Sequence, residues 1–61
     1  MESIKEVLMR RDGMGEEEAT ELVLEAWEEL HRRLEAGEAV YDICEEYFGL
    51  EPDYLEELLF A

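Results

Sequence analysis

The chain has 61 residues, 48% of them hydrophobic, and a formal net charge of −14 that nineteen acidic and five basic side chains produce. This charge argues against direct binding to nucleic acid or to anionic lipid. A chain this short forms one domain that buries only about 60% of the surface of its unfolded form, and its single cysteine and single histidine supply neither an internal disulfide nor a closed zinc site.

The first predicted helix spans about residues 3–11. Ser3 and Glu6 have the spacing of a capping box, in which two side chains satisfy the free amides of a helix start. Two arginines then occupy the last turn, where cations complement the helix dipole. Gly13 follows and can adopt the positive φ that ends a helix.

The longest predicted helix spans about residues 16–36, between Gly15 and Gly37. Its apolar residues recur at spacings of three and four, which is typical of an amphipathic helix packed on a core. These residues are Ala19, Leu22, Val23, Ala26, Trp27, Leu30 and Leu34. The other side of this helix carries an almost unbroken run of carboxylates.

Two shorter helices are predicted over about residues 38–48 and 52–60. In the first, Val40 is the first of a series of apolar residues with helical spacing, and in the second, Pro52 suits the first helical position. No stretch alternates as a strand does. The sequence therefore predicts an all-α fold, a small bundle of three to four helices with one long central amphipathic helix.

No apolar stretch approaches the roughly 20 residues that span a bilayer, and the N-terminal segment lacks the apolar core of a signal peptide. We therefore expect a cytoplasmic protein with no membrane partner. Because domains of this size usually need a disulfide, a metal or a partner chain, we also expect a homodimer.

Two stretches, RRDGMGEEEATELV (residues 10–23) and YDICEEYFGLEPDYLEELL (residues 41–59), resemble a group of short acidic proteins encoded in phages and prophages and generally left without a known function. The FGLEPDYL string is the most specific part of the resemblance, which covers about half the chain. It implies no catalytic residues. It does imply a genomic setting, within a host cell, in which small inhibitors of host defence are common.

Two possible reactive sites have simpler interpretations. Glu28 and His31 form an E-x-x-H pair, the ligand spacing of di-iron helical bundles, but Glu28 lies about 155° from the centre of the apolar stripe and faces water. Cys44 lies on an apolar helix face beside acids, which is typical of a small buried residue rather than a nucleophile. We expect no metal, no cofactor and no enzymatic activity.

The basic residues occur only within residues 5–11 and 32–33, so the acids gather in one strongly negative region. Such a surface either promotes solubility or mimics the phosphates of a nucleic acid and occupies a basic groove in another protein, with strong salt dependence. The candidate partner-binding residues are Glu17, Glu18, Glu21, Glu25 and Glu28.

A second strip on the long helix lies about 60 to 120° from the centre of the main stripe. Its members are Thr20, Leu24, Trp27 and His31. A leucine beside a tryptophan suggests an interaction patch, and we expect self-association through it. The alternative is that another helix of the same chain covers the strip.

The leading functional hypothesis is a non-catalytic binding protein that inhibits a basic host protein of defence or nucleic-acid binding. One alternative is a structural or assembly component of a phage particle or regulatory complex, in which the acids serve only solubility. A third possibility is a metal-binding carboxylate bundle.

Overall fold

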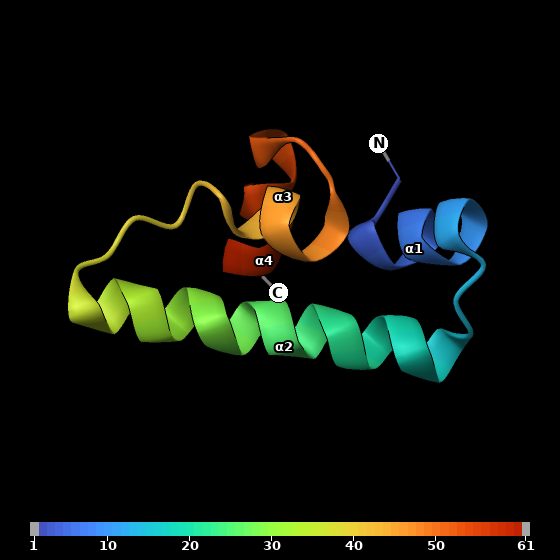
Figure 1. Cartoon of the computed structure of the whole chain (residues 1–61), viewed down its shortest axis with the longest axis horizontal. Helices are drawn as coiled ribbons and strands as arrows, with labels where there is room; N and C mark the ends of the chain where they lie inside the picture. Colours follow the sequence, from blue (N-terminus) through green and yellow to red (C-terminus); the bar gives the residue numbers. More distant parts are fainter. Residues whose placement is uncertain (1, 61) are drawn as a thin grey trace.

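The computed structural model describes residues 2–60 (Figure 1). It contains the helices α1 (Ile4–Asp12), α2 (Glu16–Ala36), α3 (Ile43–Phe48) and α4 (Leu55–Leu59), with a 3₁₀ turn, η1 (Pro52–Tyr54), before α4. No strand occurs within residues 2–60. The predicted all-α fold with one long helix is therefore confirmed.

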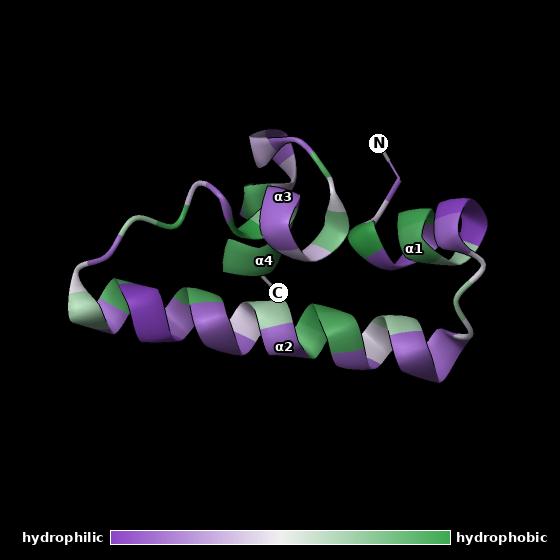
Figure 2. Ribbon diagram, in the orientation of Figure 1, coloured by the Kyte–Doolittle hydropathy of each residue, from purple (hydrophilic) through white to green (hydrophobic). Residues whose placement is uncertain are grey.

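Helix α2 organises the molecule because its 21 residues span most of the longest dimension, 34 Å. The other helices lie on one side of it (Figure 1), and α1, α3 and α4 each contact it. Figure 2 shows hydrophilic residues along the side of α2 that faces away from them. The buried core consists of Ile4, Leu8, Ala19, Ala26, Leu30, Ile43, Cys44, Phe48, Leu55 and Leu58.

Helix α1 begins with the predicted capping box. The Ser3 hydroxyl accepts the backbone N–H of Glu6 at 3.1 Å, and the Glu6 carboxylate accepts the backbone N–H of Ser3 at 3.3 Å. Gly13, at φ +66°, ends the helix. Each bound differs by one residue from the expected 3–11: Ser3 is the cap and lies outside the helix, and the helix continues to Asp12.

The ends of α2 also agree with the sequence. Gly15 is the N-cap, and Gly37 adopts φ +74° at the C-terminal end, a left-handed conformation that glycine adopts without steric cost. One expected core residue differs: Leu34 is 48% exposed. It lies in the last turns of α2, above which only the connecting segment to α3 runs (Figure 1).

The predicted helix over residues 38–48 is wrong in its first half. Residues 38–42 form no helix, and α3 begins only at Ile43. Val40 is half-buried against the core, as a helical face would require, but it reaches the core from a non-helical connection. The physical reason is distance: α2 ends beyond the core (Figure 1), and a helix would advance only about 1.5 Å per residue on the way back to it.

The predicted helix over 52–60 is divided into two parts. Pro52 occupies the first position of η1, as expected, and α4 follows from Leu55 to Leu59. Phe60 lies outside the helix as its C-cap. The helix therefore ends one residue before the expected bound, because the backbone of Phe60 has left the helical conformation.

Two contacts tie distant parts of the chain together. The backbone N–H of Ile4 donates to the Glu57 carboxylate, with both oxygens at 3.0 Å. The Arg11 guanidinium donates to the backbone carbonyls of Phe48 and Gly49 at the end of α3. The start and the end of α1 are therefore each held by residues from the C-terminal third of the chain.

Candidate functional site

The five carboxylates predicted to bind a partner are all exposed on α2. We call Glu17, Glu18, Glu21, Glu25 and Glu28 the acidic face. Within residues 2–60, none of the five makes an ion pair or a side-chain hydrogen bond. Their charges therefore remain available to a partner.

The basic side chains are all engaged elsewhere, because each of the five forms an ion pair with an acid outside the acidic face. The pairs are Lys5–Glu16, Arg10–Glu2, Arg11–Asp12, Arg32–Glu29 and Arg33–Glu29, with nitrogen–oxygen distances of 2.6 to 3.0 Å. The lysines and arginines therefore leave the acidic face uncompensated.

Glu29 lies on the same helix, but two arginines compensate the charge of its carboxylate. Its side chain accepts hydrogen bonds from Arg32 at 2.8 and 2.9 Å and from Arg33 at 2.7 Å. These bonds lower the pKa of the Glu29 carboxyl from 4.5 to about 2, and the bonds from Arg32 have the largest effect. Arg33 also reaches Glu46 at 2.8 Å and so joins α2 to α3.

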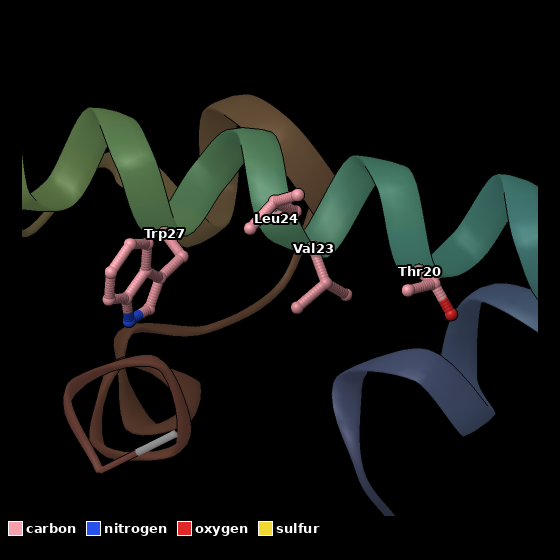
Figure 3. Close-up of a pocket in the computed structure, with 4 residues that line it drawn as sticks. All are labelled: Thr20, Val23, Leu24 and Trp27. Carbon is pink, nitrogen blue, oxygen red and sulfur yellow. The ribbon is translucent and has the colours of Figure 1, made fainter.

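An apolar hollow of about 310 Å³ lies on α2, and Figure 3 shows the four side chains that line it. We call it the apolar groove, and Thr20, Val23, Leu24 and Trp27 line it. Leu24 is 52% exposed, so its side chain points away from the core as expected. Val23 and Trp27 are half-buried, and both also pack against the core.

Three of the four groove residues, Thr20, Leu24 and Trp27, were predicted from the sequence to form one strip, and Val23 was missed. That residue was placed in the core stripe, where it does lie, but it also borders the groove. The available signal was its spacing, three residues after Thr20 and four before Trp27, which makes all three neighbours on a helix surface.

His31 extends the strip without lining the groove. Its ring lies against that of Trp27, with centroids 4.1 Å apart and planes inclined by 45°. The imidazole is exposed. Thr20, Leu24, Trp27 and His31 therefore form one continuous strip, as predicted, whereas self-association through it stays a prediction.

A second hollow, of about 530 Å³, continues the apolar groove toward the start of α2. Thr20 belongs to both, and Glu16, Glu17 and Glu21 complete the second lining. Since Glu16 pairs with Lys5, the unpaired acids here are Glu17 and Glu21. An apolar recess and a carboxylate-lined recess thus adjoin each other on one helix.

The two possible reactive sites are placed as the sequence indicated. Glu28 and His31 are both exposed, and residues 2–60 contain no group of three or more histidine, cysteine or acidic side chains able to hold a metal ion. Cys44 is fully buried. Burial, and secondarily the negative charge of Glu57, raises the pKa of the Cys44 thiol above its usual 9.0.

Comparison with known proteins adds no assignment, since no protein-family model, curated protein or solved structure matches the chain significantly. Within residues 2–60, no helix combines the length and apolar composition needed to cross a membrane.

Proposed function

We propose that the chain is a non-catalytic binding protein whose acidic face occupies a basic surface of another protein. The observation that carries this proposal is the distribution of ion pairs: every lysine and arginine pairs with an acid elsewhere, while the five exposed carboxylates of the acidic face have no partner within residues 2–60. A cationic surface would supply the missing partners.

The density of this charge favours a basic surface that normally binds nucleic acid. From Glu17 to Glu28 the helix rises about 16 Å, so five carboxylates give roughly one charge per 3 Å of axis. One strand of DNA carries about one charge per 3.4 Å. The acidic face therefore presents a linear charge density close to that of a single strand.

The sequence resemblance supports a setting for this activity. It points to phage-encoded proteins, among which inhibitors of host proteins are common, and so to the cytoplasm of a host cell. A nucleic-acid-mimicking inhibitor of a basic host protein fits both that setting and the acidic face.

The test is a displacement experiment. A purified basic DNA-binding protein is loaded with a fluorescent duplex, and the chain is titrated in while fluorescence anisotropy reports release of the duplex. The wild-type chain should displace the duplex at low salt and lose this ability steeply as salt rises, because counterion release drives such binding.

Two triple variants make the test specific to α2. Glu21→Lys, Glu25→Lys and Glu28→Lys together should abolish displacement. The control reverses three other exposed acids that make no side-chain bond within residues 2–60, Glu45, Glu51 and Glu56, and changes the net charge equally. If the two triple variants displace the duplex equally well, the carboxylates of α2 have no special role in binding and serve solubility.

A further inference from the structure

The apolar groove and the acidic face share an edge, and that edge is Leu24. On a helix surface, residues three and four apart are neighbours. Leu24 therefore has Thr20 and Trp27 of the groove on one side and Glu21 and Glu28 of the acidic face on the other. Anything that fills the groove over Leu24 lies within reach of unpaired carboxylates.

The two hollows share Thr20, so acidic side chains also adjoin the apolar groove along the helix axis. Next to the apolar groove lies the recess with the unpaired Glu17 and Glu21. An occupant that places an apolar side chain against Leu24 and Trp27 can therefore place a cation one turn away, in the acid-lined recess. This is the arrangement of an amphipathic helix with apolar residues at helical spacing and cations beside them.

The charges decide between two occupants. A second copy of this chain would bring its own acidic face, adjoining its own groove, to the same place, and no lysine or arginine in its α2 neighbours that groove. Like charges set against one another oppose association. A partner with cations at that edge would instead compensate the unpaired acids.

We propose that the apolar groove binds the apolar side of a basic amphipathic helix of the partner protein, whose cations pair with Glu17, Glu21 and Glu28. This inference rests on the proposed function. It specifies that the basic surface of the partner is an amphipathic helix. Leu24 and Trp27 contact the partner's apolar side chains, and the carboxylates fix its orientation along α2.

The test uses two synthetic helical peptides of about four turns. Both carry the same arginines and lysines along one flank. The first has leucines at i, i+4 and i+7 on the adjoining face, and the second has alanines there. Binding is followed by the fluorescence of Trp27, the chain's single tryptophan, with peptides that lack aromatic residues.

The wild-type chain should bind the leucine peptide at least tenfold more tightly than the alanine peptide, about the effect of burying one large apolar side chain. Leu24→Ala should remove most of this preference and leave binding of the alanine peptide unchanged. Leu34→Ala is the matched control, since Leu34 has a similar exposure, 48%, lies ten residues further along α2 and does not line the groove.

The outcomes separate this inference from the proposed function. Equal binding of both peptides, or no effect of Leu24→Ala, overturns the groove proposal while the acidic face keeps its role. If the triple lysine variant of Glu21, Glu25 and Glu28 binds both peptides as wild type does, the proposed function itself fails. Light scattering at twice the chain mass, reduced to one chain by Leu24→Ala, assigns the groove to a second copy and also overturns the inference.

Discussion

Replacing Glu57 tests the contact that joins the beginning of the helical fold to its end. The backbone N–H of Ile4 is in the first turn of α1, where no helix carbonyl is available to it. It donates instead to both carboxylate oxygens of Glu57 at 3.0 Å, and the Ile4 side chain is fully buried.

The expected size of the effect follows from these bonds. A hydrogen bond to a charged group contributes about 1.5–3 kcal/mol, and a negative charge at a helix N-terminus adds about 0.3–1 kcal/mol. Glu57→Gln keeps a neutral acceptor and should lower the free energy of unfolding by about 1 kcal/mol, whereas Glu57→Ala removes the acceptor and should lower it by about 2 kcal/mol. For a small domain, 1 kcal/mol corresponds to about 4–8 °C in melting temperature.

Thermal unfolding followed by circular dichroism at neutral pH measures these shifts. The control is Glu56→Gln, which removes the same charge from an exposed neighbour that makes no side-chain hydrogen bond within residues 2–60. Since the chain is strongly negative, losing one charge should by itself be neutral or slightly stabilising. If Glu57→Gln melts at or above the temperature of Glu56→Gln, the carboxylate does not stabilise α1 and the reasoning is refuted.

Three further results are expected. Arg11→Ala removes the donor to the two carbonyls that end α3, so its melting temperature should fall several degrees below that of Arg10→Ala, whose side-chain partner is the exposed Glu2. The pKa of Glu29 is about 2 in place of 4.5, so its contribution to stability is complete above about pH 4.5 and is lost as the pH falls through about 2; in urea titrations the difference between wild type and Glu29→Gln should shrink over that interval. The buried Cys44 thiol should resist alkylation in the native protein and react at once in urea.

The helices could be predicted from the sequence where the determining interactions are local. The capping box of Ser3 and Glu6 and the glycines that end α1 and α2 act within one turn of the residues they affect. The apolar period of α2 is equally local and identified both its core side and the exposed position of Leu24. These are the features for which the structure and the sequence agree.

The remaining features depend on the positions of the helices relative to one another in the folded chain. Val40 has the spacing of a helical face, and only the position of α2 relative to the core favours a non-helical connection there. The bond from Ile4 to Glu57 joins residues 53 positions apart, and that from Arg11 to Phe48 joins residues 37 apart. Neither leaves a local signal, because each depends on the packed arrangement of helices.

The distribution of cations connects the fold with the proposed binding surface. Lys5 joins α1 to the first turn of α2, Arg11 joins α1 to the end of α3, and Arg33 joins α2 to α3. Each of these contacts crosses from one helix to another, whereas the acidic face contributes no such contact within residues 2–60. Five like charges within about 16 Å repel one another, which lowers stability, and within residues 2–60 no ion pair or side-chain hydrogen bond offsets that repulsion. Folding and the proposed binding therefore depend on different charged residues, so charge reversal on the acidic face tests binding without removing a contact that holds the helices together.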